Sequence, residues 1–99
     1  MSQMIDTMRV LLVEDDEDHA MLLMRCLDKC EVNNTVDHVT DGEQALNFLY
    51  AREGYENRKL PSLILLDLNL PRVSGHEVLR KLKSDPEMRV IPVVVLTTS

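Results

Sequence analysis

The chain has 99 residues, a formal net charge of −6 at pH 7 and a pI near 4.9. This length allows one domain at most, and 44% hydrophobic with 28% charged residues is typical of a folded globular chain. The acidic balance argues against a nucleic-acid or anionic-membrane surface, because both require clustered Lys and Arg.

Short apolar runs alternate with helical patterns along the chain. Residues 10–13, 63–66 and 93–96 are continuous apolar runs, which are typical of strands buried on both faces of a parallel sheet. Residues 35–39 mix polar and apolar positions, and we interpret them as a strand at the sheet edge.

Three helices are predicted between these strands. Residues 16–27 begin with acidic side chains, which suit the positive end of a helix dipole, and continue with apolar residues at helical spacing. A second helix is predicted from residue 41 and a third over residues 74–84, ending before Pro86 because proline interrupts a helix. Gly75 is expected to relax the backbone where the third helix begins.

The order of elements, β-α-β-α-β-α-β, predicts a parallel sheet with right-handed crossovers. We expect an α/β fold with a doubly wound, flavodoxin-like sheet, in which the first strand lies between the second and third and the fourth lies beyond the third. Residues 1–7 would be an N-terminal extension and residues 8–99 an incomplete domain, truncated after the fourth strand. The uncovered apolar strand at 93–96 would invite pairing with another chain, so we expect a homo-oligomer.

Nothing in the sequence indicates secretion, a membrane span or a zinc site. There is no basic and apolar leader, and no apolar run near the roughly 20 residues that cross a bilayer, so we expect a cytoplasmic protein. Cys26 and Cys30 lie four residues apart on one predicted helix, but no histidine stands at a convincing ligand spacing. We interpret both as small apolar residues in the core or near the surface.

Acidic residues follow the first and third strands. In open α/β sheets, ligands bind beyond the carboxyl ends of the strands where the strand order reverses, which in this topology lies between those two strands. We therefore expect the carboxylates of Asp15, Asp16 and Asp67 to converge. Such carboxylates repel one another, and Mg²⁺ is the usual ion that makes their proximity tolerable. The alternative is that residues 14–18 are simply a solvated helix start.

A carboxylate beside Mg²⁺ can act as the nucleophile in phosphoryl transfer and form an aspartyl-phosphate. Asp67 is the candidate, because it follows a buried strand and precedes a turn. A hydroxyl within residues 97–99 could reach a phosphoryl oxygen on Asp67. The alternatives are that Asn69 and Pro71 are ordinary turn residues, and that Thr97 is a β-branched residue closing a strand.

In combination these motifs resemble the receiver domain of two-component response regulators. The resemblance covers about residues 8–99 and rests on Val13-Glu14-Asp15-Asp16, the segment from Leu65 to Pro71, Gly75, and Ile91-Pro92 leading to Thr97. Residues 41–46 and 96–99, with the long loop before Pro61, look like the single-domain subgroup that is paired with phytochrome-type histidine kinases.

The resemblance implies a function and a set of site residues. Asp67 would accept a phosphoryl group from a sensor histidine kinase of the phytochrome type. Asp16, Asp67 and the backbone carbonyl of Asn69 would ligate Mg²⁺ directly, and Asp15 would act through a bound water. Thr97 would be the switch hydroxyl that turns toward the phosphoryl group.

Two other readings stay open. Family members continue through a fourth helix, a fifth strand and a fifth helix, and a lysine after the fifth strand pairs with the phosphoryl oxygens. A shortened receiver could therefore act only as a binding or oligomerisation module. A hydrolase with an aspartyl nucleophile, such as a haloacid-dehalogenase-like phosphatase, would want a second Asp where this chain has Asn69. We expect no turnover enzyme, because the chain would catalyse only its own phosphorylation.

Overall fold

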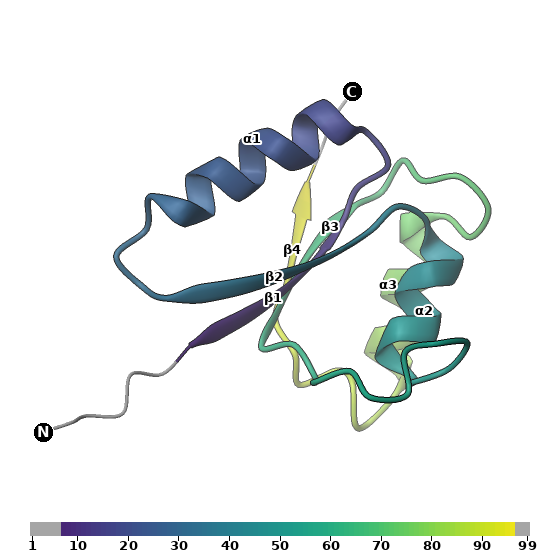
Figure 1. Ribbon diagram of the computed structural model, residues 1–99. Coiled ribbons are helices and arrows are strands. Elements are labelled where there is room, and N and C mark those ends of the chain that lie inside the picture. Colours follow the sequence, from purple (N-terminus) through teal and green to yellow (C-terminus); the bar gives the residue numbers. More distant parts are fainter. Residues whose placement is uncertain (1–6, 97–99) are drawn as a thin grey trace, which may run out of the picture.

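The structure is a computed structural model of the chain, and it describes residues 7–96. Strands and helices alternate as the sequence predicted (Figure 1). Their bounds are β1 Met8–Val13, α1 Glu17–Asp28, β2 Asn34–Val39, α2 Gly42–Leu49, β3 Leu63–Asp67, α3 Gly75–Ser84 and β4 Val93–Leu96.

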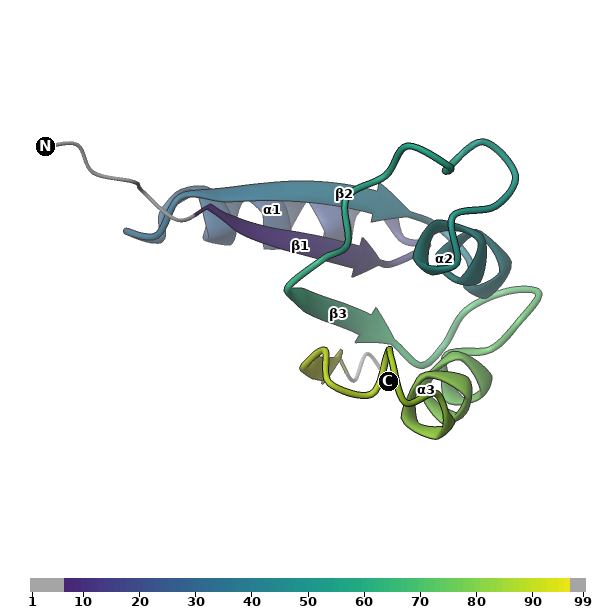
Figure 2. The same cartoon turned by 90° about the horizontal axis from the view of Figure 1, so that it is seen from below.

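The strands form one parallel sheet in the order β2-β1-β3-β4. Figure 2 shows β2, β1 and β3 side by side and pointing the same way. The predicted doubly wound, flavodoxin-like arrangement is therefore confirmed. Val13 pairs with Val39 on one side and with Leu66 on the other, so the carboxyl ends of β1 and β3 are neighbours at the point where the strand order reverses.

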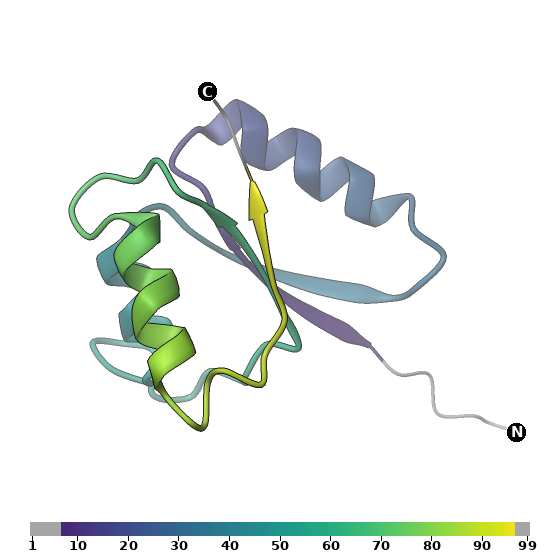
Figure 3. The same cartoon turned by 180° about the vertical axis from the view of Figure 1, so that it is seen from behind.

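Helices cover both faces of the sheet, with α1 on one face and α2 and α3 on the other (Figures 1 and 3). Side chains alternate across a strand, so β1 contributes to two cores. Val10 and Leu12 pack toward α1, whereas Leu11 and Val13 pack toward α2 and α3. All four are fully buried, and burial of one such side chain stabilises the fold by about 1.5–3 kcal/mol.

Each helix begins at a side-chain cap. Asp16 caps α1, Asp41 caps α2 and Ser74 caps α3, and in each case a side-chain oxygen accepts a hydrogen bond from a backbone N–H of the first turn. A cap of this kind contributes about 1 kcal/mol. The start of each helix is therefore fixed by the loop that follows the carboxyl end of a strand.

The edge strand β4 is less covered than its apolar sequence suggested. The side chains of Val94 and Val95 are 48% and 37% exposed, and within residues 7–96 this strand pairs with β3 alone. Cys26 and Cys30 are free and exposed, so they lie at the surface rather than in the core. None of the helices in the described part of the chain has both the length and the apolar character needed to cross a bilayer.

Candidate active site at the ends of β1 and β3

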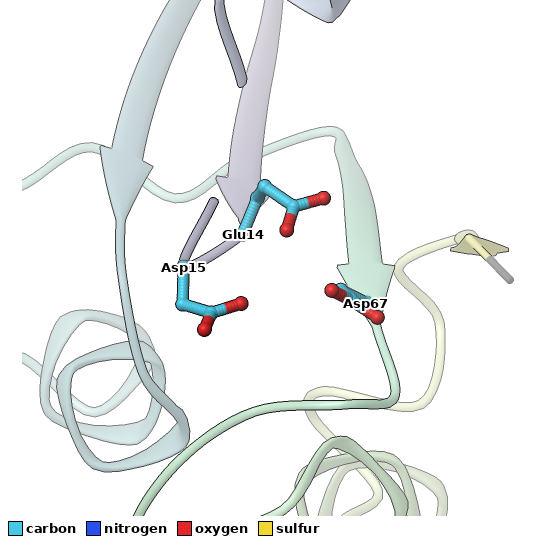
Figure 4. A group of neighbouring side chains, drawn as sticks. All are labelled: Glu14, Asp15 and Asp67. Atoms are coloured by element: carbon cyan, nitrogen blue, oxygen red, sulfur yellow. The ribbon is translucent and has the colours of Figure 1, made fainter. Parts of the chain in front are cut away.

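Three carboxylates gather at the carboxyl ends of β1 and β3 (Figure 4). Glu14 and Asp15 follow β1, and Asp67 is the last residue of β3. One carboxylate oxygen from each of the three lies within 4.8 Å of the other two. Glu14 and Asp67 are almost completely buried, at 1% and 2% exposure, and Asp15 is exposed. The sequence thus located two of these three carboxylates, Asp15 and Asp67.

Asp16 does not belong to this carboxylate group, so the expected convergence of Asp15, Asp16 and Asp67 is found only for Asp15 and Asp67. Its Oδ1 accepts hydrogen bonds from the backbone N–H groups of Asp18 and His19, at 2.9 and 3.2 Å. The carboxylate is therefore engaged at the start of α1, in the capping role that Asp often has. An Asp immediately before an acidic first turn is itself an N-cap signature, so the sequence did carry this signal.

Glu14, and not Asp16, is the third carboxylate beside Asp15 and Asp67. Its backbone N–H donates to the carbonyl of Val39 at 3.1 Å, so the hydrogen bonding between β1 and β2 continues one residue beyond the strand. Its side chain is buried beside Asp67. Glu14 was not singled out in the sequence because the apolar run ends at Val13, and the run does not reveal how far the strand direction persists.

Burial raises the pKa of the Glu14 carboxyl above its ordinary value of 4.5. The backbone N–H of Asp16, which donates to Oε2 at 3.2 Å, opposes this pKa shift, whereas the hydrogen bond to Asp67 and the charge of Asp67 reinforce it. Within the described residues Oε1 of Glu14 has no hydrogen-bond partner, and Nδ1 of His19 lies 3.9 Å from it. A buried acceptor of this kind is costly unless something else satisfies it.

A tight turn orients Asp67. Its Oδ1 accepts a hydrogen bond from the backbone N–H of Asn69 at 2.9 Å, and the N–H of Gly75 donates to the carbonyl of Leu68 at 3.3 Å. A Cβ atom on Gly75 would lie 2.3 Å from the carbonyl oxygen of Asp67. Gly75 has no positive φ, so the expected backbone freedom is not its role: a side chain there would push α3 away from the turn.

This arrangement fits a hard divalent cation. The carboxylates lie close enough to share one ion, and the unsatisfied Oε1 of Glu14 is an oxygen of the type that Mg²⁺ and Mn²⁺ favour. Asn69, whose carbonyl was expected to be a ligand, lies in the turn directly after Asp67. Thr97, the expected switch hydroxyl, lies outside the described residues.

Comparison with known proteins identifies the family. The family model described as the response regulator receiver domain matches residues 10–99. Curated relatives include the probable methanogenesis regulatory protein FilR2 of Methanothrix harundinacea, 48% identical over 94 residues, and response regulator Rcp1 of Synechocystis sp., 44% identical over 90 residues. These matches cover 95% and 91% of this chain but only 60% and 61% of the two relatives.

Two solved structures are also similar. The phosphorylated cyanobacterial phytochrome response regulator RcpA matches with a TM-score of 0.90 and 44% identity, over 95% of this chain and 67% of that one. The Mn²⁺-bound form of Rcp1 matches with a TM-score of 0.90 and 43% identity, over 93% of this chain and 66% of that one. The similarity therefore extends over the sheet and the strand ends that hold the carboxylates.

Proposed function

Because this chain belongs to the response regulator receiver domain family, we propose that Asp67 accepts a phosphoryl group in a two-component phosphorelay in the cytoplasm. One observation supports this most directly: the buried carboxylate of Asp67 lies within 4.8 Å of the carboxylates of Glu14 and Asp15 at the strand-order switch point. The protein acts as a switch that promotes its own phosphorylation and is not a turnover enzyme.

The donor is a phosphohistidine of a sensor histidine kinase. A carboxylate oxygen of Asp67 attacks the phosphorus, so that a P–O bond forms while the P–N bond to the imidazole breaks. The electron pair of the broken bond stays on the imidazole nitrogen, which takes up a proton. The hydrogen bond from the Asn69 N–H holds Oδ1 of Asp67 in place, which fixes the orientation of the carboxylate for attack.

We propose that Mg²⁺ binds among these oxygens. The carboxylates of Asp15 and Asp67 and the backbone carbonyl of Asn69 would hold the ion, with Glu14 beside them. When bound, Mg²⁺ supplies positive charge that neutralises the carboxylates and the phosphoryl oxygens. The Mn²⁺-bound structure of the relative Rcp1 supports this assignment. Thr97 remains the proposed switch hydroxyl.

The kinase partner is proposed to be of the phytochrome type. The support is the similarity to RcpA, which is a phytochrome response regulator. The chain spans about 60% of the length of the two curated relatives, so partners that bind other parts of such proteins lie beyond this proposal.

Phosphoryl uptake tests the proposal. The chain is incubated with Mg²⁺ and either phosphoramidate or beryllofluoride, and uptake is measured by intact-protein mass spectrometry and by ¹⁹F NMR. We expect uptake of one group by the wild type and none by Asp67→Asn. Asp28→Asn, which removes an exposed carboxylate from the end of α1, serves as the matched control and should behave like the wild type. Equal uptake by Asp67→Asn and the wild type would refute the assignment.

A second function is supported by the edge strand. Val94 and Val95 of β4 are exposed, and an exposed apolar edge strand favours pairing with another chain. On this reading the protein is a binding or oligomerisation module that pairs with a second copy through β4 and takes up no phosphoryl group. The uptake experiment separates the two readings.

A further inference from the structure

We infer that Arg72 is a positioning residue for this site, because it clamps the loop of residues 68–74 onto the start of α2. The loop begins directly after Asp67 and contains Asn69, so the inference rests on the proposed function in assigning the Asn69 carbonyl to a bound Mg²⁺. Among the described residues, the ion pairs of Arg72 are with Asp41 and Glu43 and not with the carboxylate group.

Two ion pairs form the clamp. Nε of Arg72 lies 3.6 Å from Oδ2 of Asp41, and its Nη1 lies 3.6 Å from Oε1 of Glu43. Asp41 is buried and caps α2, whereas Glu43 is exposed in the first turn of the same helix. Asp41 is shielded from solvent but the Arg72 side chain is 68% exposed, so solvent screens the pair from the Arg72 side and its contribution is modest.

The backbone of Arg72 supports a specific role for its side chain. Its φ is 63°, in the left-handed region that residues other than Gly, Asn and Asp rarely adopt. Glycine would adopt this conformation without strain. Arginine at this position therefore carries a backbone cost that glycine would avoid, and the ion pairs to α2 are contacts that can offset it.

Close packing brings the same loop against α2. A Cβ atom on Gly42 would lie only 1.8 Å from the carbonyl oxygen of Val73, so the loop backbone and the helix start are in direct contact. At its other end the loop is held by the hydrogen bond from the Asn69 N–H to Asp67. The clamp at Arg72 and the anchor at Asp67 thus bracket the short segment that carries the Asn69 carbonyl.

A loop held at both ends loses little conformational freedom when it binds an ion, which favours binding. Releasing the clamp should leave the carboxylates in place but allow residues 68–74 to move. The expected consequence is faster amide exchange in the loop and weaker binding of Mg²⁺, without loss of the fold.

Variants at Arg72 separate the clamp from general stability. Arg72→Gly and Arg72→Ala both remove the ion pairs, but only glycine relieves the backbone strain. We expect Arg72→Gly to melt at a higher temperature than Arg72→Ala, while both bind Mg²⁺ about threefold more weakly than the wild type in calorimetric titration. Arg72→Lys should recover part of the affinity, and Arg80→Ala, which removes an exposed cation from α3, should leave it unchanged.

Asp41→Asn provides the reciprocal test. Asparagine can still accept the hydrogen bond that Oδ1 of Asp41 receives from the N–H of Gln44 at 2.7 Å, so it keeps the cap but removes the charge. We expect Asp41→Asn to weaken Mg²⁺ binding in the same direction, and the double variant with Arg72→Gly to lose less than the sum of the two single losses.

Hydrogen exchange of the metal-free protein gives a readout that needs neither Mg²⁺ nor phosphoryl uptake. We expect exchange in residues 68–74 to be several times faster in Arg72→Gly than in the wild type. Unchanged exchange and unchanged Mg²⁺ affinity in that variant would overturn the clamp, whether or not Asp67 is phosphorylated. If exchange is faster in Arg72→Gly, and the wild type binds Mg²⁺ but takes up no phosphoryl group, the proposed function is overturned. The role of Arg72 in holding the loop is then still supported. A wild type that binds no Mg²⁺ would overturn the assignment of Arg72 to the metal site.

Discussion

The negative charge of Glu14 is costly in this fold, because burial and the nearby Asp67 carboxylate both raise its pKa above 4.5. A raised pKa means that the folded state binds a proton more tightly than the unfolded state. The stability that protonated Glu14 contributes is therefore complete below about pH 4.5 and is lost as the pH rises through the folded-state pKa. Without divalent cations, the free energy of unfolding of the wild type should fall as the pH rises above about 4.5. The free energy of unfolding of Glu14→Gln should fall much less.

Urea unfolding of the metal-free protein at a series of pH values measures this effect. Glu17→Gln, which removes an exposed carboxylate from the first turn of α1, is the matched control and should retain the slope of the wild type. Identical pH dependence in the wild type and in Glu14→Gln would show that Glu14 carries its charge in the folded state without the expected cost.

Asp16 should behave as a helix cap and not as a metal ligand. Because its Oδ1 accepts two backbone hydrogen bonds at the start of α1, Asp16→Ala should lower the free energy of unfolding by about 1 kcal/mol. Asn can still cap α1, so Asp16→Asn should lower the free energy of unfolding by only about a few tenths of a kcal/mol. We expect calorimetric Mg²⁺ affinity to fall about tenfold or more in Asp15→Asn and less than about threefold in either Asp16 variant. A loss in Asp16→Asn as large as in Asp15→Asn would restore Asp16 as a ligand.

The difference between Asp16 and Glu14 shows which part of the site could be predicted from the sequence. Asp67 was recognisable because a buried strand ends on it and a turn follows. Asp15 was recognisable because it lies between the first strand and its helix. The third carboxylate depended on how far the direction of β1 persists past Val13. Glu14 still follows the strand and is buried, whereas Asp16, two residues further on, is exposed because it already caps α1. An error of two residues therefore exchanges a buried Glu for an exposed Asp.

At the scale of elements, the contact between α2 and the loop of residues 68–74 should be sensitive to a single methyl group. In Gly42→Ala the new Cβ would lie 1.8 Å from the carbonyl oxygen of Val73. That oxygen is backbone and cannot swing aside, so the helix and the loop must separate. We expect a loss of about 1–3 kcal/mol in chemical unfolding, as for other overpacked sites, together with weaker Mg²⁺ binding.

Gly54→Ala is the matched control for this prediction. Nothing lies within 4 Å of a Cβ atom at Gly54, but its φ of 98° is unfavourable for alanine. This variant should lose about 1 kcal/mol through backbone strain alone and should bind Mg²⁺ like the wild type. Equal Mg²⁺ affinity in Gly42→Ala and Gly54→Ala would show that the contact with α2 does not influence the site.

Elements with a local cause were predictable, and contacts between elements were not. The apolar run of 63–66 and the cap at Ser74 each act within a few residues, so β3 and α3 could be located from the sequence. The pairing of Arg72 with Asp41, in contrast, joins two loops that become neighbours only when the parallel sheet has formed. Its geometry depends on the strand order and on how closely α2 packs, which no local pattern encodes.

At the scale of the whole molecule, the order β2-β1-β3-β4 places β4 at an edge of the sheet formed by residues 7–96. Its exposed side chains, Val94 and Val95, favour association with a second copy of this 99-residue chain. We expect the chain to sediment as a dimer at micromolar concentration, and Val94→Lys to sediment as a monomer, because a charge on an edge strand disfavours pairing. Val32→Lys is the control, since Val32 is similarly exposed but lies outside the strands.

The dimer prediction also separates the two proposed functions. The proposed phosphoryl site lies at the strand ends that hold Asp15 and Asp67 and does not include Val94, so monomeric Val94→Lys should still take up a phosphoryl group in the presence of Mg²⁺. An oligomerisation module depends on β4 instead, so the same variant would lose the only function that such a module has. A wild type that sediments as a compact monomer would rule out pairing through β4. If that monomer also took up a phosphoryl group on Asp67, the receiver function would be supported and the oligomerisation module would be refuted.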